Sequence, residues 1–131
     1  MSALAKLGVK GPLAESWLVD AGVVVPDAVY GWRTCGANGL IARMDRQEFL
    51  LEEGVGSTDL TGLAERLCSG ARNVYPVARQ DVGLTLCGRR AVEVFAQTCA
   101  YDFARSTVAA ATSSGDAVVM TRIALVSCTV L

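Results

Sequence analysis

The sequence predicts an α+β protein in which helices pack on one face of an antiparallel sheet. Apolar residues recur at helical spacing in three segments, and short runs of alternating apolar residues lie between these segments. Glycine, proline, asparagine and aspartate punctuate the runs, as turns require. With 131 residues, 52% of them hydrophobic, the chain is long enough to bury a core, and we treat residues 1–131 as a single domain.

The first helix is predicted to begin at Gly11–Pro12, because proline is well tolerated in a first helical turn. Gly22 is suited to end this helix. The apolar stripe of the helix consists of Ala14, Trp17, Leu18 and Ala21. Residues 23–32 are expected to form an extended linker, because their proline prevents a helix.

A β-hairpin is predicted next, with strands at Leu40–Met44 and Glu48–Glu52. Thr58 or Asp59 is expected to cap a second helix, and Gly70 to end it. The stripe of this helix consists of Leu60, Leu63, Ala64 and Leu67.

Three further elements are predicted between residues 73 and 103. Asn73–Val77 is a short strand, and its proline places it at an edge or end of a sheet. Residues 82–87 alternate as a half-buried strand whose apolar positions are Val82, Leu84 and Leu86. Gly88 breaks this pattern, and a helix begins at Ala91 with the stripe Val92, Phe95, Ala96 and Cys99. Asp102 follows directly after the stripe.

The last part of the chain is predicted to be a mobile loop at Ser106–Gly115 and a strand over Ala117–Leu131. The resulting order of helices and strands is typical of a ferredoxin-like antiparallel sheet with helices on one face. Residues 123–131 form an apolar run without a charge, and a strand of this kind needs a neighbour to cover its edge. We therefore expect either a truncated chain or a partner that completes the fold.

Composition argues against several classes of function. Twelve basic and thirteen acidic residues are interspersed, so we expect no binding to nucleic acid. Uncharged runs reach only about ten residues, against ~20 needed to cross a bilayer, so we expect no membrane span. The N-terminus has no apolar stretch of signal-peptide length. These observations predict a cytoplasmic protein.

Cysteine and histidine usage narrows the chemistry further. The five cysteines are widely spaced and odd in number, which predicts buried thiols in a reducing compartment, without a disulfide framework or zinc site. The chain contains no histidine, which excludes serine–histidine and cysteine–histidine nucleophiles. Any chemistry would depend on a carboxylate, tyrosine, cysteine or arginine.

Four short segments resemble the gamma subunit of heterotetrameric sarcosine oxidase. They are LTLCGR at 84–89, QTCAYDF at 97–103, VMTRI at 119–123 and GLIARMDRQEFLLEEG at 39–54. The same segments are more distantly similar to the folate-binding aminomethyltransferases of the glycine cleavage system. The resemblance extends over residues 11–131, although this family shows a further strand and helix at its C-terminal end.

The resemblance implies a folate-binding, aminomethyltransferase-like fold that is incomplete at the C-terminus. It also implies a non-catalytic accessory subunit of a sarcosine-oxidase-type complex in one-carbon metabolism, and we expect no catalysis by this chain alone. The larger partner subunits would carry the flavin, and we expect this chain to bind no cofactor by itself. If it does bind one, the resemblance implies tetrahydrofolate. The alternative is an aminomethyltransferase-like domain that uses Asp102 in one-carbon transfer.

Asp102 matches an aspartate that contacts folate in the aminomethyltransferases, but Ala100 and Tyr101 replace that family's threonine and asparagine. A carboxylate there could stabilise positive charge as the one-carbon unit leaves. The other interpretation is a carboxylate that accepts hydrogen bonds from loop amides. Arg89 and Arg90 begin a helix, where cations oppose the helix dipole. They would either bind an anion such as the glutamate tail of folate, or extend into water.

Five residues are candidates for contact with a partner. Arg122 interrupts an apolar strand, and it either points into solvent or pairs with an acid on a partner subunit. Tyr30 and Trp32 lie in the predicted linker, where aromatics either anchor an interface or pack locally. Leu125 and Leu131 belong to the bare C-terminal strand. That strand also permits a homodimer in which two copies pair their edges.

Overall fold

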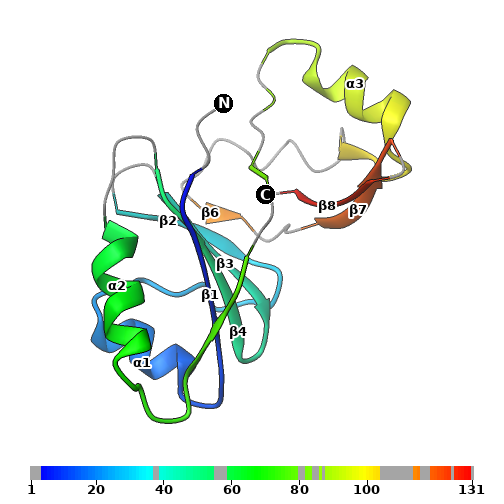
Figure 1. The fold of residues 1–131 in the computed structure, drawn as a ribbon. Helices are drawn as coiled ribbons and strands as arrows, with labels where there is room; N and C mark the ends of the chain where they lie inside the picture. The colour runs from blue at the N-terminus through cyan, green and yellow to red at the C-terminus, as the bar shows by residue number, and fades with distance from the viewer. Residues whose placement is uncertain are drawn as a thin grey trace.

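The computed structural model describes residues 4–36, 39–54, 59–79, 82–83, 86, 88–103, 114–115, 119–124 and 126–130. These residues form an α+β fold, as predicted (Figure 1). The helices are α1 (Ala14–Asp20), α2 (Asp59–Cys68) and α3 (Ala91–Thr98). The strands are β1 (Lys6–Lys10), β2 (Trp32–Cys35), β3 (Gly39–Asp45), β4 (Glu48–Glu52), β5 (Tyr75–Val77), β6 (Ser114–Gly115), β7 (Val119–Ile123) and β8 (Val126–Val130).

The main sheet has the strand order β5-β1-β4-β3-β2-β6, and each neighbouring pair is antiparallel. Helix α1 joins β1 to β2 and helix α2 joins β4 to β5, so each helix connects strands that are consecutive in sequence but are not neighbours in the sheet. Strands β7 and β8 form a separate antiparallel pair.

The hydrophobic core lies between one face of the main sheet and the helices α1 and α2. Alternate residues of β1, β3 and β4 point to this face, because successive strand residues point to opposite sides. The core residues are Leu7, Val9, Ala14, Leu18, Ile41, Phe49, Leu51, Leu60, Leu63, Leu67 and Val74. Since both helices contribute to one cluster, the prediction of helices on one face is confirmed for α1 and α2.

The opposite face of the sheet carries charges along β1 and β4. Lys6 Nζ lies 3.6 Å from Glu52 Oε2, and Lys10 Nζ lies 3.1 Å from Glu48 Oε2. Arg79, just after β5, also contacts Glu48 at 3.1 Å. These pairs follow from the register, which places Lys6 opposite Glu52 and Lys10 opposite Glu48.

Most predictions for residues 11–77 are confirmed. Helix α1 buries Ala14 and Leu18, and α2 buries Leu60, Leu63 and Leu67. The β3–β4 hairpin turns at Arg46 and Gln47, inside the predicted turn. Strand β5 lies at the sheet edge, where its proline needs no ladder partner on the outer side.

Two strands of the main sheet between residues 6 and 35 were not predicted. Strand β1 was overlooked because Lys6 and Lys10 resemble an exposed terminus, although the three residues between them are buried. The linker over residues 23–32 was wrong at its end, because Trp32 begins β2 and pairs with Ala42. The β-branched Thr34 and the pairing with β3 both favour a strand over Trp32–Cys35.

The predicted strand over residues 82–87 is wrong for its described residues. Val82, Gly83 and Leu86 lie outside any strand, and Val82 is 76% exposed. A Cβ atom on Gly83 would lie 3.1 Å from Lys6 Nζ, so this segment passes over the Lys6–Glu52 pair. Alternation alone therefore did not identify a strand, because no neighbouring strand pairs with these three residues.

The predicted single strand over 117–131 is instead the β7–β8 hairpin. The chain turns at Ala124, which has a positive φ of 47°. Val119 pairs with Val130 and Ile123 with Val126. Of the predicted loop at 106–115, residues 106–113 lie outside the described residues, while Ser114 and Gly115 form β6 and pair with β2.

Candidate functional site

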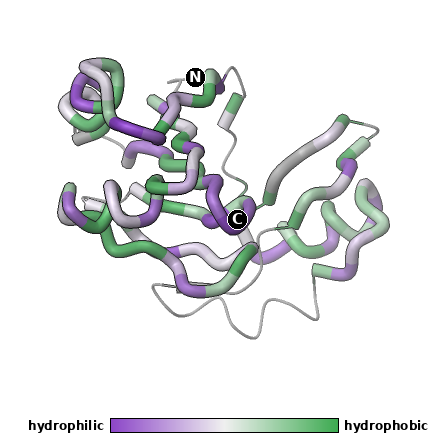
Figure 2. Tube along the Cα trace, turned by 90° about the horizontal axis from the view of Figure 1, so that it is seen from below, coloured by the Kyte–Doolittle hydropathy of each residue, from purple (hydrophilic) through white to green (hydrophobic). Residues whose placement is uncertain are grey.

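The residues from Gly88 to the end of β8 form what we call the C-terminal group: 88–103, 119–124 and 126–130. Helix α3 and the β7–β8 hairpin lie together, away from α1 and α2 (Figure 1). Apolar residues are frequent along this part of the chain (Figure 2). The buried hydrophobic residues of the described chain nevertheless all fall between Leu7 and Val74. The C-terminal group thus contributes nothing to the core.

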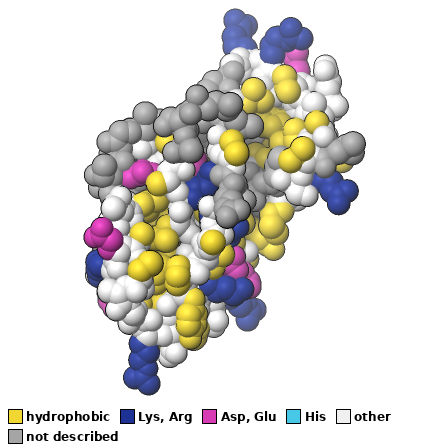
Figure 3. All heavy atoms as spheres, in the orientation of Figure 1, with side chains coloured by type: hydrophobic (Ala, Val, Ile, Leu, Met, Phe, Trp, Pro, Cys, Tyr) yellow, Lys and Arg dark blue, Asp and Glu magenta, His cyan; other side chains and the backbone are white. Residues whose placement is uncertain are grey.

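Several large apolar side chains of the C-terminal group face solvent. Val94 is 44% exposed, Tyr101 38%, Met120 61% and Val126 63%. Helix α3 begins at Ala91 as predicted, but it buries none of its residues. The predicted stripe is wrong at Cys99, which is extended beyond the helix and forms a β-bridge with Ile123. Figure 3 shows hydrophobic side chains gathered on the visible face of this end of the molecule, with basic side chains at its margin. Exposed apolar groups of this kind mark interaction sites.

Short contacts around Cys99 fix α3 against the hairpin. Cys99 forms a β-bridge with Ile123, and the Ala124 amide donates to the Thr98 carbonyl at 2.9 Å. Cys99 Sγ lies 3.2 Å from Thr121 Oγ1 and accepts a hydrogen bond from the Tyr101 amide at 3.3 Å. The C-terminal group therefore has a defined internal arrangement, although none of its described side chains is buried.

An aromatic cluster follows the end of α3. The rings of Phe95 and Phe103 have centroids 4.6 Å apart, and those of Tyr101 and Phe103 are 4.8 Å apart. The first pair is tilted and the second is edge-on, and both centroid distances lie in the favourable range for aromatic pairs. Sequence analysis placed Phe95 on the helix stripe but did not predict this cluster; the three aromatics within nine residues were the available signal.

The structure does not bring the predicted folate-contacting residues together. Asp102 is exposed beyond the C-terminal end of α3, whereas Arg89 and Arg90 are exposed at its N-terminal end. Eight helical residues separate the two ends by about 12 Å. Arg90 Nε already contacts Glu93 Oε2 at 2.7 Å, so an anion of its own helix occupies this arginine.

The predicted interface residues are also dispersed. Arg122 is exposed on β7 opposite Ser127, within the C-terminal group. Trp32 is half-buried on β2, and Tyr30 is exposed with a φ of 66° just before it. The Tyr30 amide donates to the Arg43 carbonyl at 2.8 Å, so these aromatics belong to the main sheet. Leu125 and Leu131 lie outside the described residues.

Arg43 makes an extensive set of polar contacts that sequence analysis did not predict. Its guanidinium lies 2.6 Å from Glu15 Oε2 and donates to the carbonyls of Pro26 at 3.0 Å and Arg46 at 3.0 Å. The same group lies 5.3 Å from the centroid of the Phe49 ring. Arg43 thereby joins α1, the segment after α1 and the β3–β4 turn, which is a structural role.

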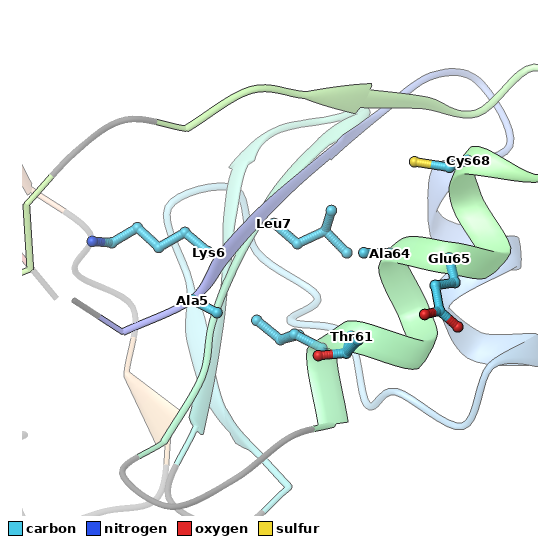
Figure 4. Close-up of a pocket in the computed structure, with 8 residues that line it drawn as sticks. Ala5, Lys6, Leu7, Thr61, Ala64, Glu65 and Cys68 are labelled. Atoms are coloured by element: carbon cyan, nitrogen blue, oxygen red, sulfur yellow. The ribbon is translucent and has the colours of Figure 1, made fainter. Parts of the chain in front are cut away.

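An open groove lies between β1 and α2 (Figure 4). Its volume is about 380 Å³, and its described lining residues are Ala5, Lys6, Leu7, Leu60, Thr61, Ala64, Glu65 and Cys68. Leu7 points from β1 toward α2, while the Lys6 side chain points away from the groove (Figure 4). This volume falls within the range of small-molecule sites.

The chemistry of the described residues is limited. No cluster of three or more cysteine or acidic side chains with metal-binding geometry occurs among them. Cys35 and Cys99 are half-buried, but Cys68 is exposed, so the expectation of burial is wrong for Cys68. None of α1, α2 and α3 combines the length and apolarity that a bilayer-crossing helix needs.

Comparison with known proteins gives no assignment: no family model matches this chain, and no curated protein matches it.

Proposed function

We propose that this protein is a non-catalytic subunit that docks onto a larger protein through its C-terminal group. One observation carries the proposal: α3 and the β7–β8 hairpin expose Val94, Met120 and Val126, and none of their side chains that the structure describes is buried. A two-stranded sheet is marginally stable alone, so burial of these side chains against a partner would stabilise it.

The arrangement of polar groups supports docking more than catalysis. The charged residues of the C-terminal group that the structure describes are exposed and spread along α3, beyond its end and over β7. An active site instead needs an acid, base or nucleophile held with its partners in one cavity. Arg122 and Arg89 lie at the surface of the C-terminal group, where arginine is a favoured interface residue.

The class of partner comes from the resemblance of residues 84–89, 97–103 and 119–123 to sarcosine oxidase gamma subunits. We propose larger flavin-bearing and folate-bearing subunits of an amine-oxidising complex as the partners. The strand order β5-β1-β4-β3, with α1 and α2 as crossovers, supports a ferredoxin-like fold for residues 6–77. An aminomethyltransferase-like fold would be expected to contain a unit of this kind.

The direct test is native mass spectrometry of the tagged protein isolated from its own source. We expect it to remain bound to larger subunits whose mass includes flavin. A monomer with no bound subunit, at concentrations where the cell extract retains other complexes, would rule the proposal out. A dimer of this chain alone would favour pairing of two copies through β8.

Substitution of Met120 by aspartate is expected to reduce the amount of co-isolated partner at least tenfold. Met120 is 61% exposed on β7, so the change leaves the core intact while it places a charge in a desolvated contact. Val19→Asp is the matched control, because Val19 is 56% exposed on α1, remote from the C-terminal group. Equal partner recovery from both variants would contradict docking at this surface.

A second proposal from the resemblance is tetrahydrofolate binding at Asp102. The exposed Asp102 lies between Tyr101 and Phe103, whose rings could stack on a pterin. Calorimetric titration with tetrahydrofolate is expected to show binding by the unmodified protein and at least tenfold weaker binding by Asp102→Asn. Asp20→Asn, an equivalent change on α1, is the control. No heat of binding at millimolar tetrahydrofolate would exclude this second proposal.

A further inference from the structure

The groove between β1 and α2 has an apolar floor and a polar margin. Leu7 and Leu60 are almost fully buried at its base, and Ala64 is half-buried between them and the rim. Thr61, Glu65 and Cys68 are exposed on α2 along the margin. Their spacing follows from the helix: residues 61, 64, 65 and 68 are neighbours on one side of α2.

The charge of this groove is negative. Glu65 supplies a carboxylate at the margin, and no ion pair to Glu65 occurs within the described residues. Lys6 contributes to the wall, but its ammonium points to the opposite face of the sheet, where it lies 3.6 Å from Glu52 (Figure 4). The Lys6 side chain is only 7% exposed there, so it does not neutralise the groove.

We propose that this groove binds a small amphiphilic amine. The alkyl chain would lie over Leu7, Leu60 and Ala64, where burial of apolar surface is favourable. The ammonium would lie beside the Glu65 carboxylate, with the Thr61 hydroxyl available as a hydrogen-bond acceptor. This site is separate from the C-terminal group, so it does not depend on the proposed function.

The proposal is tested by titration of the ¹⁵N-labelled protein with hexylammonium, hexanol and hexanoate, which share one alkyl chain and differ in charge. We expect hexylammonium to shift the amide signals of Leu7, Ala64 and Cys68 saturably. Because an exposed ion pair contributes little, its affinity should exceed that of hexanol by about two- to fivefold. Hexanoate should bind more weakly than hexanol.

Two variants and a control separate charge from shape. Glu65→Gln should remove the preference for hexylammonium over hexanol, and Asp20→Asn, an equal change on α1, should retain it. Ala64→Met should weaken all three ligands, because a longer side chain fills the groove from α2. The proposal fails if none of the three ligands shifts these amides saturably, or if the unmodified protein binds hexanol and hexylammonium equally.

Discussion

Replacement of Phe49 by alanine is expected to destabilise the protein by about 3–5 kcal/mol, the usual cost of truncating a buried phenylalanine. Phe49 is fully buried on β4, within the single cluster formed by the main sheet, α1 and α2. Its ring also lies under the Arg43 guanidinium, at 5.3 Å, so truncation removes a second contact. The free energy of unfolding of a native protein is only about 5–15 kcal/mol, so this loss is a large fraction of the total stability.

Equilibrium urea denaturation followed by circular dichroism measures this change. Val24→Ala is the control, because Val24 is 64% exposed and its truncation should alter the free energy of unfolding by less than about 0.5 kcal/mol. Met120→Ala should be similarly mild when no partner is present, since Met120 is exposed on β7. A loss below about 1 kcal/mol for Phe49→Ala would show that Phe49 lies outside the core.

The elements that the sequence predicted are those whose local patterns agree with their packing. In α2, the apolar stripe and the glycine that follows the helix both indicate the same element. The β3–β4 hairpin was predictable because its two strands are close together in the sequence. Strand β1 differs, because its alternation is hidden by two lysines that pair with Glu52 and Glu48 only in the folded sheet. Long-range pairing of that kind has no signal in the segment itself.

In the C-terminal half the error is the opposite one: strands were predicted where the described residues form none or form a turn. Residues 82–87 alternate as a strand should, but Val82 is exposed, and a strand requires a neighbour as well as a pattern. The run over 117–131 contains enough β-branched residues for a strand, yet nothing in it marked Ala124 as a turn. Alanine rarely adopts positive φ, so the usual glycine or asparagine signal for a hairpin was missing.

The candidate sites were also predictable only where the signal is local in the sequence. Charge, cysteine count and the missing histidine restrict the chemistry from the sequence alone. The groove beside α2 could not be predicted, because it requires the unrecognised β1 as its second wall. The contacts of Arg43 were equally hidden, since Glu15 lies 28 positions away in the chain.

Substitution of Gly11 by alanine is expected to destabilise the protein by at least about 3 kcal/mol. Gly11 has a φ of 139°, where an L-residue is strained by about 1–3 kcal/mol. A Cβ atom there would also lie 2.3 Å from the Asn73 carbonyl oxygen, which is backbone and cannot rotate away. The turn between β1 and α1 would have to move, along with the hydrogen bond from the Gly11 amide to Gln47 at 2.9 Å.

Two other glycines separate these causes. Gly70 has a φ of 106° but nothing within 4 Å of an added Cβ, so Gly70→Ala should show backbone strain alone, about 1–3 kcal/mol. Gly62 lies inside α2 with open space around it, so Gly62→Ala should stabilise the protein by about 0.5–1 kcal/mol. Urea denaturation of all three variants should therefore rank Gly11→Ala below Gly70→Ala and Gly70→Ala below Gly62→Ala. If Gly11→Ala and Gly70→Ala prove equally stable, the close approach of Asn73 to Gly11 does not limit the side chain, and the described packing of β1 against the segment before β5 is wrong.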